Sequence, residues 1–206
     1  MSSTPLYTVG VLALQGAFSE HLEYLAEASQ LPRLAKHQFE FLAVRTPQQL
    51  QKCHALVVPG GESTSMSLIA ERTGMLQPLV EFARNRPVWG TCAGLIFLAS
   101  EICNGRPHQK ALGAMSIRVT RNAFGRQLDL FDAPRDFGSF APGLGEFRTV
   151  FIRAPVVSGP FSILENGLVV AVRQGNILGT LFHPELSGDC RFHGWFLEEF
   201  VVPAHC

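Results

Sequence analysis

The sequence predicts an α/β fold, with an open, mostly parallel twisted sheet, helices on both faces, and a single domain over residues 1–206. Short apolar runs alternate with segments of helical composition through the first half of the chain. These runs are continuously apolar, which is typical of strands buried on both faces. Several of them end in glycine-rich turns, and open α/β sheets gather their functional groups at such strand ends.

The first half of the chain alternates strands with helices. Ser19 is a candidate N-cap for the first helix, in which Leu22, Leu25 and Ala26 share one face. We expect strands at 8–14, 39–44, 55–58 and 87–89. We expect helices or helical turns after Ser19 and at 47–52, 65–72, 75–85 and 93–102.

The second half of the chain is less regular. Apolar runs predict strands at 116–120, 150–153, 168–173 and 177–182. The segment 132–145 is rich in Pro, Gly and Phe, which favours a loop. A closing helix is expected at 192–201.

The composition is neutral and poor in charge. Apolar residues make up 47% of the chain and charged residues 17%, and 17 basic side chains balance 17 acidic ones. This balance excludes an intrinsically disordered chain, and we expect no nucleic-acid partner. The apolar runs are far shorter than the ~20 residues of a membrane helix, so we expect no membrane contact. The low charge also hints at a surface that a partner covers.

The five cysteines argue for a reducing compartment. Their number is odd and no C-x-x-C pair occurs, so neither a disulfide scaffold nor a zinc ribbon is indicated. The N-terminus has no signal-peptide pattern, and we expect a cytoplasmic protein. Cys190 and His193 stand at i and i+3, and without a second pair we expect them to pack at a helix start rather than to bind metal.

The strongest chemical signal is Gly90-Thr-Cys-Ala-Gly94, which lies between a predicted strand and a predicted helix. It has the G-x-nucleophile-x-G form of a nucleophile elbow. The helix N-terminus favours a thiolate at Cys92, and its N–H groups, with that of Ala93 foremost, can hold an oxyanion. The alternative is that Cys92 is a small core residue.

A base and its orienting carboxylate follow another predicted strand. His183 and Glu185 stand at i and i+2, so both can project to one side of an extended segment that Pro184 stiffens. Glu185 would orient the imidazole and His183 would serve Cys92. Alone, the tripeptide is also compatible with a surface turn.

The third signal is Pro59-Gly-Gly-Glu-Ser-Thr-Ser65, which also follows a strand. Its glycines let backbone N–H groups approach a ligand, and one of them could complete an oxyanion hole with Ala93. A helix-entry turn capped by Ser or Thr is the alternative. The run lacks the G-x-x-x-x-G-K-[ST] pattern of a phosphate loop.

These residues resemble the class I triad glutamine amidotransferases, whose sheet is flavodoxin-like and three-layered, and among them most closely the glutaminase subunits of pyridoxal 5′-phosphate synthase. The matching blocks span nearly the whole chain in the family order. They are Gly10-Val-Leu-Ala-Leu-Gln-Gly-Ala17 with Glu20-His21, Pro59 to Thr64, Gly90 to Ile96, Arg121-Asn-Ala-Phe-Gly-Arg-Gln127, Phe151-Ile-Arg-Ala-Pro155 and Phe182 to Leu186.

The resemblance implies hydrolysis of L-glutamine to glutamate and ammonia through a γ-glutamyl thioester on Cys92. It also implies the site residues. Glu62 would bind the α-ammonium of glutamine and Arg121 its α-carboxylate. Further substrate contacts fall to Gly61, Ser63, Ile152 and Arg153, while Gly61, Ala93 and, indirectly, Gln15 would form the oxyanion hole. The role of His21 does not follow from the sequence.

The resemblance further implies a (β/α)₈ barrel synthase as partner, which takes up the ammonia for vitamin B6 biosynthesis. No cofactor motif occurs, so we expect no cofactor. Two alternatives stay open: a γ-glutamyl hydrolase or a subunit of another synthase, and a non-enzymatic pseudo-glutaminase that regulates a partner. The chain departs from the common family pattern at 27–41, at 154–169 and at its C-terminus.

Overall fold

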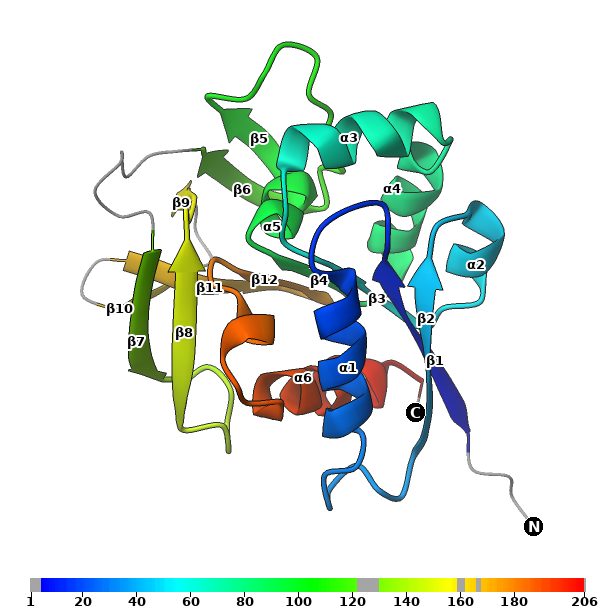
Figure 1. Cartoon of the computed structure of the whole chain (residues 1–206), viewed down its shortest axis with the longest axis vertical. Coiled ribbons are helices and arrows are strands. Elements are labelled where there is room, and N and C mark those ends of the chain that lie inside the picture. Colours follow the sequence, from blue (N-terminus) through cyan, green and yellow to red (C-terminus); the bar gives the residue numbers. More distant parts are fainter. Residues whose placement is uncertain (1–4, 122–129, 159–161, 166–167, 206) are drawn as a thin grey trace.

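In a computed structural model, the chain folds around a central seven-stranded sheet (Figure 1). The structure describes residues 5–121, 130–158, 162–165 and 168–205. The strand order is β10-β11-β12-β4-β3-β1-β2. Five neighbouring strands are parallel, namely β1 (Leu6–Leu12), β2 (Gln38–Val44), β3 (Ala55–Val58), β4 (Val88–Thr91) and β12 (Ile177–Thr180). Antiparallel β11 (Leu168–Gln174) and β10 (Ser162–Glu165) complete one edge.

Helices cover both faces of this sheet (Figure 1). One face carries α2 (Pro47–Gln51), α3 (Ser63–Arg72), α4 (Leu76–Asn85) and α5 (Ala93–Leu98). The other carries α1 (Phe18–Ala28) and α6 (Arg191–Phe196), which continues as the π-helical turn η3 (Leu197–Val201) and then the short η4 (Pro203–His205). The sheet therefore separates two cores.

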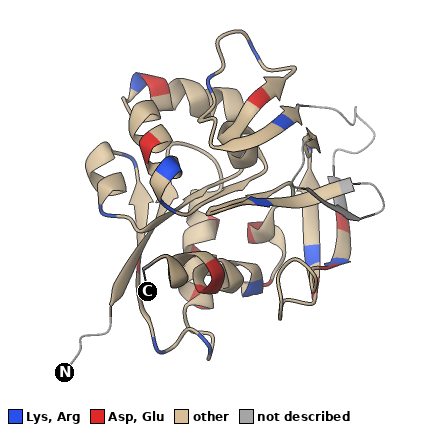
Figure 2. Ribbon diagram, turned by 180° about the vertical axis from the view of Figure 1, so that it is seen from behind, with Lys and Arg blue, Asp and Glu red and all other residues tan. Residues whose placement is uncertain are grey.

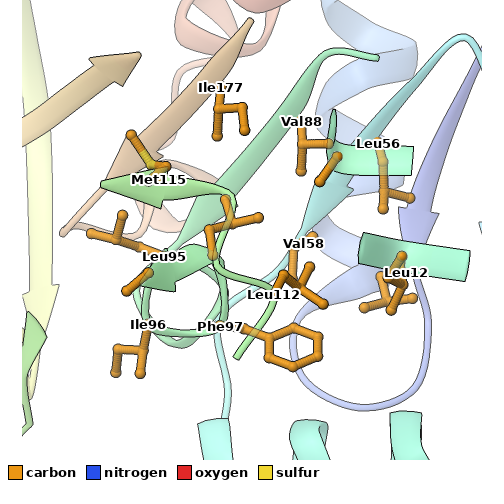
Figure 3. Packing of buried hydrophobic residues seen from close by; sticks show 14 of the residues in the cluster. Leu12, Leu56, Val58, Val88, Leu95, Ile96, Phe97, Leu112, Met115 and Ile177 are labelled. Atoms are coloured by element: carbon orange, nitrogen blue, oxygen red, sulfur yellow. The ribbon is translucent and has the colours of Figure 1, made fainter. Parts of the chain in front are cut away.

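The first core is aliphatic and the second is aromatic. Figure 3 shows the first, in which Leu95 and Phe97 of α5 lie among Leu12, Val58 and Val88 of the sheet. The second core surrounds Trp89 and Phe192, whose ring centroids are 5.4 Å apart. Burial on both faces explains why the strands read as continuous apolar runs in the sequence.

Two smaller sheets flank the large one (Figure 1). One contains β5 (Ala99–Cys103), β6 (Met115–Thr120) and β9 (Val156–Ser158). The other is a hairpin of β7 (Leu130–Asp136) and β8 (Glu146–Ile152). Figure 2 shows Lys and Arg positions interspersed with Asp and Glu positions rather than gathered in one band. Within the part of the chain that the structure describes, no helix has the length and hydropathy to cross a membrane.

Several expected elements differ from the observed ones. The helix expected at 93–102 ends at Leu98, because residues 99–103 pair with β6 as strand β5. The loop expected at 132–145 is extended as far as Asp136, where β7 pairs with β8. Pro134 is tolerated there because this two-stranded sheet has only edge strands. Strands β9 and β10 were not expected.

Helix ends differ as well. Helix α1 begins at Phe18, after Ala17, and no side chain caps it, so the prediction of Ser19 as N-cap is wrong. The closing helix expected at 192–201 is α6 followed by the π-helical turn. The blocks that carry the candidate site nevertheless lie at strand ends, as an open α/β sheet requires.

Candidate active site

Cys92 occupies a sharp turn between β4 and α5. Its φ of 47° lies in the left-handed region, which a non-glycine residue rarely adopts. Its N–H donates to the Thr180 carbonyl at 2.8 Å, which fixes the turn on the neighbouring strand β12. A Cβ at Gly94 would overlap the Val58 carbonyl, and a Cβ at Gly90 would press on the Gly94 backbone. The two glycines therefore permit the turn that presents the Cys92 thiol.

His183 faces Cys92 from the end of β12. The His183 N–H donates to the Val150 carbonyl of β8 at 2.7 Å, and its Nδ1 lies 2.8 Å from Glu185 Oε1. Its ring lines the same cavity as Cys92, and the interaction with Cys92 contributes to the pKa of the imidazole. Glu185 lies within the short helix η2 (Pro184–Leu186) and is buried. The structure thus brings Cys92, His183 and Glu185 together in the order of a catalytic triad.

Nearby partners shift the pKa values of His183 and Glu185 in the direction opposite to the effect of burial. Burial alone would lower the pKa of His183, but hydrogen bonds and charge from Cys92 and Glu185 raise it to about 10. Burial alone would raise the pKa of Glu185, but its interactions with His21 and His183 hold it well below its usual range. The resting site therefore favours an imidazolium between a carboxylate and the Cys92 sulfur.

A cavity of about 360 Å³ opens beside Cys92. Its lining includes Cys92, His183 and all the residues expected to contact the substrate or the oxyanion, with the exception of Gln15. Ile96 and Pro155 also line it, and the sequence did not single them out. The lining residues are Gly61, Glu62, Ser63, Cys92, Ala93, Ile96, Arg121, Ile152, Arg153, Pro155 and His183.

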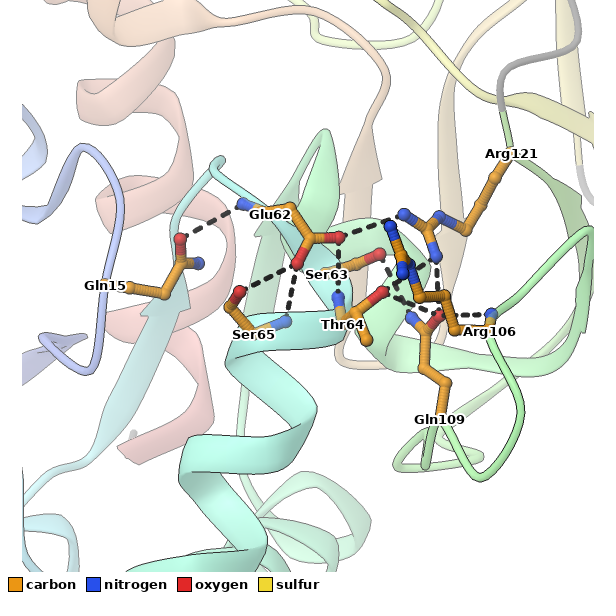
Figure 4. A network of polar contacts seen from close by, with 8 residues as sticks. All are labelled: Gln15, Glu62, Ser63, Thr64, Ser65, Arg106, Gln109 and Arg121. Carbon is orange, nitrogen blue, oxygen red and sulfur yellow. Dashed lines mark hydrogen bonds and ion pairs between the residues drawn. The ribbon is translucent and has the colours of Figure 1, made fainter.

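Glu62 and Arg121 both line this cavity and pair with each other, as Figure 4 shows for the pair. Arg121 Nη2 donates to Glu62 Oε1 at 3.0 Å. The Glu62 carboxylate also caps α3, accepting from the N–H groups of Thr64 at 3.0 Å and Ser65 at 2.7 Å. Partial burial would raise the pKa of Glu62, but these hydrogen bonds outweigh it and lower the pKa to about 2. Glu62 is thus a carboxylate across the physiological range.

Gln109 is a member of this network that the sequence did not reveal (Figure 4). Its Oε1 accepts from Arg121 Nη1 at 2.7 Å, and its Nε2 donates to Ser63 Oγ at 3.0 Å. It comes from the connection between β5 and β6, whose path depends on a strand that was not expected. No local motif around Gln109 could have identified it.

The Gln15 side chain lies against Gly61, outside the cavity wall. Gln15 Oε1 accepts from the Glu62 N–H at 3.1 Å, and a Cβ at Gly61, whose φ is 147°, would overlap the Gln15 amide. Ala93 is the first residue of α5, so its N–H has no carbonyl partner within the helix. Cys92 Sγ is also 3.8 Å from the Ile152 carbonyl, which brings β8 against the nucleophile.

A family model for the SNO glutamine amidotransferases matches residues 11–202. The chain belongs to this family. Its curated relatives include "Pyridoxal 5′-phosphate synthase subunit SNO1" of Saccharomyces cerevisiae, which is 46% identical over 98% of this chain and 96% of the relative. They also include "Pyridoxal 5′-phosphate synthase subunit PdxT" of Herpetosiphon aurantiacus, 46% identical over 92% of this chain and 98% of the relative.

A solved structure titled "Crystal structure of glutamine amidotransferase" has a TM-score of 0.76 and 42% identity, and the match covers 92% of this chain and 97% of that one. A putative GMP synthase subunit from Thermoplasma acidophilum matches at a TM-score of 0.60 and 15% identity, which concerns the fold alone. The predicted family and the predicted α/β fold of this SNO-family chain are both confirmed.

The other cysteines that the structure describes, and His193, do not line the cavity. Cys190 precedes α6 and His193 is buried within it, in line with packing at a helix start. Within the described residues, no group of three or more His, Cys, Asp and Glu could hold a metal. Cys53, Cys92, Cys103 and Cys190 are free thiols. Cys206 and residues 122–127 of the Arg121 block lie outside the described residues.

Proposed function

We propose that this chain is the glutaminase subunit of a pyridoxal 5′-phosphate synthase. It hydrolyses L-glutamine to L-glutamate and ammonia and supplies the ammonia to a synthase subunit. The observation that carries this proposal is that Cys92 and His183, with Glu185 bonded behind His183, share one cavity with the ion pair of Glu62 and Arg121. The printed names of the relatives support the assignment to pyridoxal 5′-phosphate synthesis.

The chemistry begins with attack of the Cys92 thiolate on the side-chain amide carbon of glutamine. The carbonyl oxygen becomes an oxyanion, which the N–H groups of Ala93 and Gly61 would stabilise. Gln15 would hold the Gly61 segment through its bond to the Glu62 N–H. The tetrahedral adduct collapses, His183 gives its proton to the leaving nitrogen, and ammonia departs from a γ-glutamyl thioester.

Water then cleaves this thioester. His183 is now neutral and takes a proton from the water molecule, whose oxygen attacks the thioester carbonyl. Collapse releases glutamate and restores the thiolate opposite the imidazolium. Glu185 keeps the imidazole ring and its proton in place in both half-reactions, because it accepts from Nδ1 throughout.

The paired charges of Glu62 and Arg121 suit a zwitterion. The α-ammonium of glutamine would bind Glu62 and its α-carboxylate would bind Arg121, so each charge of the substrate meets its opposite. The two side chains neutralise each other in the substrate-free chain, and glutamine would insert between them. Ser63, Ile152 and Arg153 would complete the walls around the substrate.

The partner would be a (β/α)₈ barrel synthase. Free ammonia in neutral water is mostly ammonium, which is not a nucleophile, so the product is useful only if it passes directly into a partner. We also expect the complex in the cytoplasm, where the Cys92 thiol stays reduced.

A glutaminase assay with the purified chain, alone and mixed with the barrel synthase, tests this function. We expect little glutamate from the chain alone and a marked rise on mixing. Equal release of glutamate without the synthase would contradict gating by the partner. Hydrolysis of γ-glutamyl peptides but not of glutamine would indicate a γ-glutamyl hydrolase, and no hydrolysis in any mixture would indicate a regulatory subunit.

A further inference from the structure

A second pair of histidines lies directly behind the triad. His21 Nε2, on α1, is 3.3 Å from Glu185 Oε2, the carboxylate oxygen that His183 does not use. His21 Nδ1 is in turn 2.9 Å from His193 Nε2 on α6. A continuous row of polar side chains thus runs from the ends of β4 and β12 to helices α1 and α6. Its members, in order, are Cys92, His183, Glu185, His21 and His193.

The outer part of this row is sealed from water. His21 and His193 are both fully buried, and Trp89 packs edge-on against each of them at 5.7 Å and 5.0 Å between ring centroids. A polar group in such surroundings costs free energy unless it is paired. The two imidazoles are paired with each other and with the triad carboxylate, so the aromatic core tolerates them only in this arrangement.

The contacts favour one distribution of protons. His21 Nε2 lies 3.3 Å from Glu185 Oε2, at ion-pair distance, and 3.3 Å from Thr91 Oγ1, to which it is hydrogen-bonded, so a proton on this nitrogen has both oxygens within reach. His21 Nδ1 is then bare and accepts from the Nε2–H of His193.

The opposite arrangement, with protons on both nitrogens of His21, would place a proton on His193 Nδ1. That atom is buried and has no partner among the described residues. A buried N–H without an acceptor is rarer and costlier than a bare acceptor nitrogen. Burial also holds the pKa of His193 well below its ordinary value.

We propose that His21 and His193 are positioning residues of the glutaminase site, which fix the outer oxygen of Glu185 so that its inner oxygen keeps His183 aligned with Cys92. The inference rests on the proposed function. It adds two residues, from α1 and α6, to a triad that otherwise comes only from the ends of β4 and β12. These helices come from opposite ends of the chain, and the α1 block is far in sequence from the triad.

Two amide substitutions separate the two contacts of His21. The amide nitrogen of Gln reaches the position of the histidine Nε2, whereas the amide of Asn reaches only that of Nδ1. His21→Gln therefore keeps a donor to Glu185, and His21→Asn keeps only the contact to His193. We expect His21→Asn to lower kcat about 10- to 100-fold, as loss of an outer-shell partner does, with KM for glutamine unchanged. His21→Gln should recover most of the loss.

The second readout is alkylation of Cys92 by iodoacetamide as a function of pH, measured on the isolated chain. Glu185, His183, Cys92, His193 and Tyr24 are the titratable groups that belong to this row or face it from the surrounding elements. We expect His21→Asn to move the pH profile of alkylation and His21→Gln to keep it. A packing role for His21 would change stability but not this profile.

Tyr24→Phe is the matched control. The Tyr24 ring packs on His193 with 5.2 Å between centroids, and its hydroxyl accepts only from the Gly188 N–H among the bonds that the structure shows. This variant disturbs the same corner of the core, and we expect it to leave kcat unchanged. A second variant, His193→Phe, keeps a ring against Trp89 but removes the donor to His21, and we expect a loss of about threefold to tenfold in kcat.

Equal kcat and equal alkylation profiles for His21→Asn and His21→Gln would overturn the proposal. If His21→Asn did not fold, an unchanged kcat and profile in His193→Phe would overturn it instead. Absence of glutamate release by the wild-type complex would contradict the proposed function, not this inference, because alkylation reports on Cys92 without any turnover.

Discussion

The two walls of the cavity hold their charges in different ways. At the catalytic wall, Glu185 is fully buried, and it is held by His183 from β12 and by His21 from α1. At the opposite wall, the Glu62 side chain is 51% exposed, and it is held by the first turn of α3 and by Arg121, which directly follows β6. The first set of charges is buried beside the aromatic core, and the second is partly exposed at the cavity.

The difference in burial indicates which part of the reaction each group of charged residues serves. Buried charges feel a low dielectric, so small displacements change their interaction strongly, and such groups suit the making and breaking of bonds. The Glu62 carboxylate is half-exposed and therefore screened by solvent, so its bond to Arg121 can be exchanged for one to the substrate at low cost, which suits capture and release of a zwitterion. We therefore expect substitutions at the catalytic wall to change kcat, and substitutions at the rim to change KM.

The largest effect should follow from Cys92→Ser. Loss of a triad nucleophile costs about 10⁴-fold or more in kcat, because no thioester can form. The measurement is glutamate release by the complex with the synthase. The same variant should still bind the synthase in a size-exclusion experiment, since the thiol lies inside the cavity. Turnover above background by this variant would show that another residue is the nucleophile.

Glu185→Gln should follow, with a loss of about 10³- to 10⁴-fold in kcat. The Gln amide can present a donor to His183 Nδ1, which would favour the wrong tautomer of the imidazole. We expect KM to stay within about twofold, because Glu185 does not line the cavity. A change confined to KM would remove the distinction between the two walls.

Arg121→Ala should raise KM for glutamine about 10- to 100-fold and change kcat little, because a charged hydrogen bond contributes about 1.5–3 kcal/mol. Arg118→Ala is the matched control. Arg118 is exposed, pairs with Glu101 on β5 and does not line the cavity. Equal effects of the two substitutions would show that Arg121 acts through general charge and not through contact with the substrate.

Gln109→Leu should raise KM by about threefold to tenfold, because Arg121 loses one acceptor but keeps Glu62. Steady-state kinetics over a range of glutamine concentrations would measure it. A fall in kcat with constant KM would indicate that Gln109 supports the catalytic wall instead.

The smallest effect concerns acid stability. The folded-state pKa of Glu62, about 2, lies below its ordinary value of 4.5, so its cap stabilises the fold above pH 4.5. That contribution is lost as the pH falls toward 2, and half-exposure keeps it below about 1 kcal/mol. Urea unfolding of wild type and Glu62→Gln should differ at pH 7 and converge near pH 2. A constant difference at all pH values would contradict this.

The strands of the central sheet could be predicted from the sequence because their signal is local. Strand β3 occupies the expected residues 55–58, and β1 is displaced by only two residues from the expected 8–14. Strand β5 could not be predicted, because its apolar residues continue a helical run. Only pairing with β6, as between Ala99 and Met115, makes them extended. Strand β7 contains a proline and depends on β8 in the same way.

The residues of the site likewise fall into those that a local sequence pattern reveals and those that only long-range contacts reveal. Gly90, Gly94 and the spacing of His183 and Glu185 are local patterns that identify the catalytic wall. The partners behind and beside it are not local, since His21 and His193 are 172 residues apart in sequence and Gln109 reaches Ser63 over 46 residues. The pairing of Glu62 with Arg121 also appears only in the folded chain, where the N-cap of α3 lies beside the end of β6.

The central claim is that Cys92 forms a covalent bond with the side chain of glutamine. Mass spectrometry of peptides from the chain–synthase complex, quenched in acid during turnover of glutamine, tests it directly. We expect a γ-glutamyl adduct on the Cys92 peptide of the wild-type chain, its accumulation in a variant with slowed thioester hydrolysis, and its absence in Cys92→Ser. Glutamate release with no adduct on Cys92, or an adduct on another cysteine, would contradict the account.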